Sequence, residues 1–130
     1  MIDLHIPATQ STPKIHTEHA QGRLVMQGDS YPENSYELFN QVFEWIEGFL
    51  AEQPPRALNL ELHLLYLNTS SIKAMMEIFD LLQAAHDRQH PVKVSWFYDA
   101  RNERVAELAE EFKEDCSFPF DILAIARSAP

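Results

Sequence analysis

The chain has 130 residues, of which 45% are hydrophobic and 11% aromatic, and this predicts a single globular domain over residues 1–130. Ten Lys and Arg against twenty Asp and Glu give a net charge of −10, which repels phosphate backbones and anionic lipid, so nucleic acid and membrane partners are not expected. The single cysteine excludes an internal disulfide. Neither a basic-then-apolar leader nor a run of about 18 apolar residues is present, so we expect a cytoplasmic protein.

The first part of the chain predicts short strands and then a helix. Residues 2–9, 14–18 and 23–27 are typical of extended segments that form an antiparallel unit. Asn34 with Glu37 three residues later has the form of a capping box, and the helix after it ends at Pro54. Its apolar positions recur at helical spacing: Phe39, Val42, Phe43, Ile46, Phe49 and Leu50.

The second part of the chain alternates strands with helices. Apolar residues at every second position make residues 58–67 the best strand, which we place centrally in the sheet. The helix that follows residues 68–71 is apolar on most of its circumference, so it either lies inside the core or presents a face to a partner. A strand over 92–98, a third helix beginning at Asp99 and a last strand over 121–126 complete the order.

These elements predict an α/β domain with a mixed sheet. Three short strands come first, and the later strands are separated by helices, which requires right-handed crossovers and parallel pairing. We therefore expect an antiparallel N-terminal part, a parallel C-terminal part and about three helices packed on the sheet.

The residues that usually carry catalysis or bind metals do not form a recognisable set. The histidine pairs His16 with His19 and His86 with His90 lack the cysteine or carboxylate partners of a zinc site, so solvated histidines are the better interpretation. Carboxylates flank Cys116 and disfavour its thiolate. With three glycines there is no glycine-rich phosphate loop. We predict no catalytic residue, no metal and no cofactor, and hence no enzyme.

Residues 68–71, Asn-Thr-Ser-Ser, place three hydroxyls where a central strand meets a helix start. Free N–H groups and the positive end of the helix dipole stabilise an anion at this point, so the fold would tolerate a phosphoryl group there. A cation near the start of a helix opposes the helix dipole, so the position of Lys73 is more favourable if an anion is bound there. Simple helix capping explains the same residues, and the sequence pattern leaves both interpretations open.

Four segments together resemble the SiaC family of regulatory phosphoproteins, which act in bacterial biofilm signalling. They read LHIPATQSTP at 4–13, GDSYPEN at 28–34, LYLNTSSIK at 65–73 and EDCSFPF at 114–120. The resemblance implies a fold similar to the anti-sigma-factor antagonists of the STAS type. It also implies a partner switch in which the dephosphorylated protein binds and activates a diguanylate cyclase, while a dedicated kinase and a PP2C-type phosphatase control one threonine.

The family's phosphorylated threonine corresponds to Thr69, with Ser70 and Ser71 as alternatives because the register against STAS proteins is uncertain. Our hypothesis for the partner-binding residues is Tyr31, Pro32, Glu33, Asn34, Asn68, Ser70, Ser71 and Lys73, while a turn plus the cap of the first helix also explains residues 31–34. Two other functions remain as hypotheses: an anti-sigma factor antagonist that binds an anti-sigma kinase, and a small enzyme that uses Cys116 or a histidine such as His63.

Overall fold

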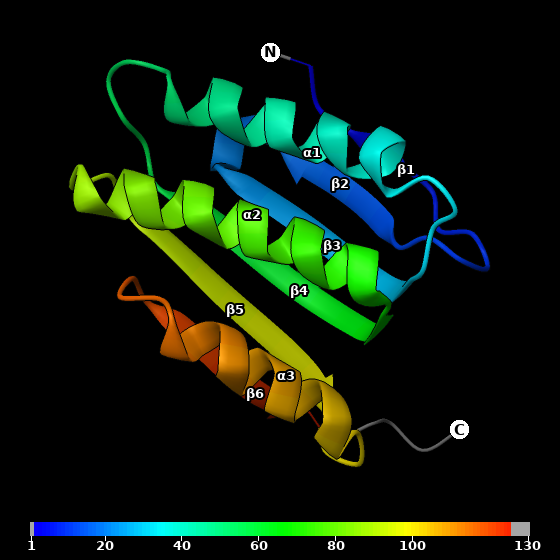
Figure 1. The fold of residues 1–130 in the computed structure, drawn as a ribbon. Coiled ribbons are helices and arrows are strands. Elements are labelled where there is room, and N and C mark those ends of the chain that lie inside the picture. The colour runs from blue at the N-terminus through cyan, green and yellow to red at the C-terminus, as the bar shows by residue number, and fades with distance from the viewer. Residues whose placement is uncertain (1, 126–130) are drawn as a thin grey trace.

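Six strands form one mixed sheet whose spatial order follows the order of the strands in the sequence (Figure 1). The computed structural model describes residues 2–125. The N-terminal strands pair antiparallel and the later ones parallel, as the sequence predicts. The strands are β1 (His5–Ile6), β2 (Lys14–Glu18), β3 (Arg23–Ser30), β4 (Leu58–Leu67), β5 (Val92–Asp99) and β6 (Phe120–Ile125).

Three α-helices connect the parallel strands: α1 (Ser35–Leu50), α2 (Thr69–Asp87) and α3 (Glu103–Glu114). A short 3₁₀ turn, η1 (His19–Gln21), joins β2 to β3. Each crossover moves one strand further in the same direction, and right-handed crossovers of that kind place every helix on the same face. Figure 1 shows the three helices side by side across that face, with α2 in the middle.

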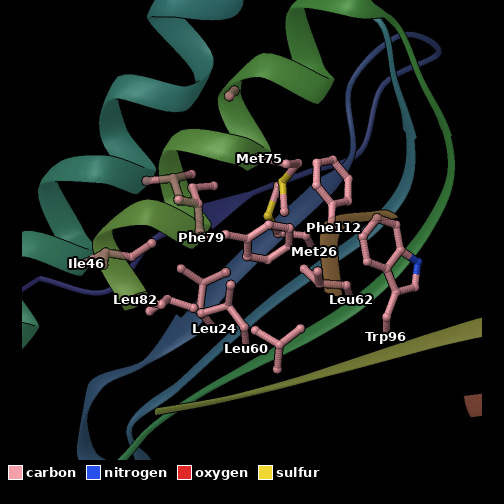
Figure 2. Close-up of a cluster of buried hydrophobic side chains, with 14 of the residues drawn as sticks. Leu24, Met26, Ile46, Leu60, Leu62, Met75, Phe79, Leu82, Trp96 and Phe112 are labelled. Carbon is pink, nitrogen blue, oxygen red and sulfur yellow. The ribbon is translucent and has the colours of Figure 1, made fainter. Parts of the chain in front are cut away.

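The core lies between the helices and the inner face of the sheet. Residues at every second position of β4 point into it, and Leu60 and Leu62 are almost wholly buried against side chains of α1 and α2 (Figure 2). The central position of α2 explains why it is apolar on most of its circumference: Met75, Phe79 and Leu82 are all buried. Of the two expectations for this helix, a place inside the core is confirmed.

The other face of the sheet carries polar and aromatic side chains instead of a second helical layer. Arg23 forms three hydrogen bonds to the Glu61 carboxylate, at 2.9, 3.1 and 3.2 Å, and one to Glu18 at 3.1 Å. The Arg23 guanidinium lowers the pKa of Glu61 below its ordinary value. The rings of His63 and Phe97 stack with centroids 4.8 Å apart. Because this face of the sheet is partly exposed to solvent, β4 alternates polar with apolar residues, and that alternation is the pattern that predicts the strand.

Two element boundaries differ from the prediction, one because of a helix cap and one because of an irregularity within a strand. The third helix does not begin at Asp99, which is still part of β5; its N-cap is Asn102, whose side chain accepts from the backbone N of Val105 at 3.2 Å. In the opposite direction, β3 continues past Gln27 to Ser30. A register shift at Gly28, where φ is +118°, makes that extension possible.

The N-terminal strand is shorter than residues 2–9, because only His5 and Ile6 pair with β2. A hydroxyl-stabilised turn follows, in which the Thr9 side chain accepts from the backbone N of Thr12 at 3.0 Å. The last strand ends at Ile125 in the described part of the chain, and the predicted end at residue 126 lies outside the described residues.

Candidate functional site at the start of helix α2

The start of α2 lies where β3 and β4 end, next to the first turn of α1. Asn68 has an extended conformation and caps α2, since its side-chain oxygen accepts from the backbone N of Ser71 at 2.9 Å. Its own backbone N donates to the carbonyl oxygen of Ser30 at 3.0 Å. Thr69 is therefore the first helical residue, and its position is determined by both the cap and the neighbouring strand.

The three consecutive hydroxyls of this segment have different environments. Ser71 has no exposed surface; its Oγ lies 2.7 Å from Ser30 Oγ and donates to the Ser30 carbonyl at 3.0 Å. Ser70 is exposed, but its hydroxyl donates to Asn68 Oδ1 at 3.1 Å and is hydrogen-bonded to Ser35 Oγ. Thr69 is exposed, and within the described residues its hydroxyl makes no hydrogen bond. Of the three hydroxyls, that of Thr69 is both exposed and without a hydrogen bond to a described residue.

The loop between β3 and α1 contributes to the same surface. Tyr31 is partly exposed, and its ring contacts that of Tyr66 edge to face with centroids 6.0 Å apart. Glu33 and Asn34 are exposed, and Asn34 caps α1 by accepting from the backbone N of Glu37 at 3.1 Å. Pro32 is buried, so it anchors the loop to the rest of the domain. The two predicted partner-binding segments, 31–34 and 68–71, are thus brought together by the fold.

Lys73 lies four residues after Thr69, which places the two side chains on the same side of α2. It is exposed. A phosphoryl group on Thr69 would therefore have a cation within reach as well as the first turn of the helix.

Sequence reasoning missed that three large apolar side chains are exposed where β4 ends and α1 begins; with the predicted Tyr31 they form what we call the apolar patch: Tyr31, Tyr36, Leu65 and Tyr66. Tyr36 is 77% exposed, Leu65 53% and Tyr66 54%. A cavity of about 240 Å³ adjoins the patch, between β4, α2 and the first half of α3. The signal was present in the sequence, because Leu65 and Tyr66 break the alternation of β4 just before its end.

The environment of Cys116 does not favour nucleophilic chemistry. Burial, followed by the nearby carboxylates of Asp115 and Asp80, raises the pKa of its thiol to about 11. The thiol donates a hydrogen bond to the carbonyl oxygen of Phe112 at 3.2 Å. At neutral pH it is protonated, which agrees with the effect of flanking carboxylates that the sequence predicts.

The histidines act within the fold, and one of them is not solvated as predicted. His90 is buried because the chain folds back after α2, and its Nε2 lies 2.6 Å from the carbonyl oxygen of Arg56. His19 Nε2 lies 2.6 Å from a carboxylate oxygen of Glu52. Among residues 2–125, no group of three or more His, Cys, Asp and Glu is arranged to hold a metal ion. In that same range, no helix has the length and apolar character needed to cross a bilayer.

Comparison with known proteins identifies the family. A family model described as "SiaC family regulatory phosphoprotein" matches residues 6–125. An uncharacterized protein of Pseudomonas aeruginosa (strain UCBPP-PA14) is 68% identical over 124 residues, which are 95% of this chain and 98% of that relative.

Two solved structures give the same result. The crystal structure of apo-SiaC from Pseudomonas aeruginosa is 67% identical with a TM-score of 0.91, and the match covers 95% of this chain and 100% of that one. A structure of diguanylate cyclase SiaD in complex with its activator SiaC, from the same organism, matches at 68% identity and a TM-score of 0.92, with 95% and 100% coverage. The resemblance inferred from the four sequence segments is confirmed, and the chain belongs to the SiaC family of regulatory phosphoproteins.

Proposed function

We propose that this chain is a partner switch that binds and activates a diguanylate cyclase when dephosphorylated, and that phosphorylation of Thr69 releases the cyclase. Family membership supports the regulatory role, and a 68% identical relative is the activator in a complex with the cyclase SiaD. The observation that carries the proposal is the state of Thr69, an exposed hydroxyl without a hydrogen bond to any described residue, three positions after Tyr66 of the apolar patch.

The dephosphorylated surface is suited to burial against a protein. The apolar patch and the adjoining cavity of about 240 Å³ gain free energy when they lose water. The hydroxyls on this surface are uncharged. Those of Ser35, Ser70 and Ser71 already have hydrogen-bond partners, so removing water from them costs little free energy. Burial of this surface therefore leaves none of these three hydroxyls without a hydrogen-bond partner.

A phosphoryl group changes this balance locally. It adds about −1.5 to −2 charges, which must lose water in the docked complex or repel acidic groups of the cyclase. The total charge of the chain would move only from −10 to about −12, so the long-range field changes little. Release should therefore depend on contacts at Thr69 and should persist in moderate salt.

In this proposal the covalent chemistry belongs to the partners. A dedicated protein kinase adds the phosphate, a PP2C-type phosphatase removes it, and the cyclase makes cyclic di-GMP. This chain is the kinase substrate and the cyclase activator, in the cytoplasm. The high pKa of the Cys116 thiol supports a role without catalysis of its own.

The test combines phosphate mapping with cyclase activity. The chain is incubated with its kinase and ATP, the phosphate is located by mass spectrometry, and cyclase activation is compared for wild type, phosphorylated wild type and Thr69→Ala. We expect the phosphorylated form to lose activation, and the phosphatase to restore it. Thr69→Ala treated with the same kinase is the matched control and should still activate.

Two results would contradict the proposal. Phosphate found only outside residues 69–71 would overturn the site, and full activation by the phosphorylated protein would reverse the direction of the switch. A pull-down of the untreated chain addresses the partner: we expect a protein with a diguanylate cyclase domain, whereas recovery of an anti-sigma kinase in its place would favour an anti-sigma factor antagonist.

A further inference from the structure

We propose that Ser35, in the first turn of α1, is a specificity-determining residue that directs phosphorylation to Thr69 by occupying the hydroxyl of Ser70. The inference rests on the proposed phosphorylation of Thr69 and adds how one hydroxyl is selected from three in a row. It concerns a residue 35 positions away from Ser70 in the sequence and on a different helix.

Burial alone does not select Thr69. Ser71 has no exposed surface, so a kinase would reach it only if the start of α2 opened. Thr69 and Ser70, however, are both exposed and adjacent. An enzyme that recognises this surface therefore meets two hydroxyls of nearly equal chemistry, and something other than accessibility must distinguish them.

Hydrogen bonding distinguishes them. The single hydroxyl proton of Ser70 is donated to Asn68 Oδ1 at 3.1 Å, so in its contact with Ser35 the Ser70 oxygen accepts and Ser35 donates. Both partners have set positions, because Asn68 caps α2 and Ser35 directly follows the residue that caps α1. The proton and one lone pair of Ser70 are thus engaged, whereas the hydroxyl of Thr69 is free of hydrogen bonds within the described residues.

Phosphoryl transfer makes demands on the acceptor hydroxyl, and because of them this difference in hydrogen bonding favours Thr69 over Ser70. The acceptor oxygen forms a bond to the γ-phosphorus of kinase-bound ATP, the bond from that phosphorus to the β–γ bridging oxygen breaks, and ADP leaves with the bond's electron pair. The hydroxyl proton passes to a base of the kinase. Ser70 must give up its hydrogen bond to Asn68 to release its proton, and one of the two lone pairs that could attack is occupied by the hydrogen bond from Ser35, whereas Thr69 has no hydrogen bond to any described residue.

The test measures phosphorylation of Ser70 in a Thr69→Ala background, so that the two sites do not compete. The kinase that modifies the wild-type chain is used with ATP, and the rate of Ser70 phosphorylation is followed by mass spectrometry. Adding Ser35→Ala should raise this rate about fivefold, the factor that corresponds to loss of one neutral hydrogen bond. With Thr69 intact, Ser35→Ala should move part of the phosphate from Thr69 to Ser70.

Two controls separate hydrogen bonding from a general loosening of the fold. Ser35→Thr keeps the hydroxyl and should leave the rate at the level of the Thr69→Ala background. Ser117→Ala removes another exposed serine whose hydroxyl is hydrogen-bonded, at 2.7 Å to Gln83, and should also have no effect. Thermal denaturation of each variant checks that the fold is retained.

The inference is overturned if Ser35→Ala leaves the rate of Ser70 phosphorylation unchanged, or if Ser35→Thr raises it as much as Ser35→Ala does. Failure of the proposed function gives a different result. In that case the wild-type chain carries its phosphate elsewhere than Thr69, or activates the cyclase when phosphorylated there. A wild type modified only on Thr69, combined with an unchanged rate at Ser70, would contradict the role of Ser35 alone.

Discussion

The two ends of the parallel sheet are held together by different chemistry. Where the parallel strands begin, charged side chains stabilise the connection from α1 to β4. Arg56 donates to the carbonyl oxygens of His19 and Ala20 at 2.7 and 3.1 Å, and its guanidinium lies over the ring of Phe49, 4.9 Å from the centroid. His19 in turn is paired with Glu52 at 2.6 Å.

Where β3 and β4 end, the hydrogen bonds between the elements are neutral, and we call this the neutral end. Hydroxyls and amides join β3, α1 and α2 through the Ser30–Ser71 pair, the Ser35–Ser70 pair and the Asn68 cap. Exposed tyrosines surround them. A phosphate on Thr69 would therefore introduce charge among neutral hydrogen bonds, whereas at the first end it would meet side chains that already form ion pairs with one another.

The largest expected effect comes from breaking the neutral end at its buried pair. Ser71→Val leaves the buried hydroxyl of Ser30 without its partner and removes one of the two hydrogen bonds to the Ser30 carbonyl, and we expect it to lower the free energy of unfolding by about 1–3 kcal/mol. Denaturant titration measures the loss. The double variant Ser30→Ala with Ser71→Ala should lose less than the sum of the single variants, because it removes both partners. Additive losses would show that the pair does not act as a unit.

A smaller loss is expected at the charged end. Arg56→Met removes two hydrogen bonds to carbonyl oxygens, one to the His19 ring, the ion pair with Glu52 and the contact with Phe49. The side chain is partly exposed, so we expect a loss of about 1 kcal/mol by denaturant titration. Arg56→Lys should recover only part of this, since an ammonium group lacks the planar fork that reaches both carbonyls. Full recovery would indicate that charge, and not the hydrogen-bond geometry, stabilises this end.

The pH dependence of stability should also come from the charged residues. The pKa of Glu61 is lowered by its hydrogen bonds from Arg23, so its stabilising contribution is complete above the ordinary value of 4.5 and is lost as pH falls through the lowered pKa. Glu61→Gln should therefore flatten the acid side of the stability curve, followed by thermal denaturation against pH. Glu33→Gln, which removes an exposed carboxylate from the neutral end, is the control. The assignment to Glu61 would be contradicted if Glu33→Gln flattened the acid side of the stability curve and Glu61→Gln did not.

The smallest expected effect is that of the phosphate on the stability of the chain itself. A phosphoryl group on Thr69 lies at the positive end of the α2 dipole and should stabilise the fold by about 0.3–1 kcal/mol, measured as a shift in thermal midpoint. Lys73→Ala should reduce that gain. A clear destabilisation would mean that the phosphate disturbs the hydroxyl pairs beneath it, and the switch would then work by opening the start of α2.

The order of the elements could be predicted from the sequence because each signal is local. Alternation in β4 and helical spacing in α1 depend on neighbouring side chains, and Asn34 and Asn68 cap their helices through contacts three residues away. The errors also have local causes. Asp99 and Asn102 are both common N-cap residues, and only the extension of β5 through Asp99 decides between them.

The site was only partly predictable. The sequence indicated that residues 68–71 start a helix, and the family resemblance pointed to Thr69. It could not show that Pro32 is buried or that Tyr36 and Leu65 are exposed. Exposure depends on how α1 and β4 pack against the rest of the molecule, which no pattern within either element specifies.

The sequence by itself determined the α/β class, the order of strands and helices, the net charge of −10 and the place where three hydroxyls meet a helix start. Only the tertiary structure decided which hydroxyl is free. Ser71 is buried against Ser30, 41 residues earlier, and Ser70 is bonded to Ser35, 35 residues earlier. The physical reason is that periodicity and capping act within a few residues, whereas burial and these hydrogen bonds exist only after β3, α1 and α2 have packed together.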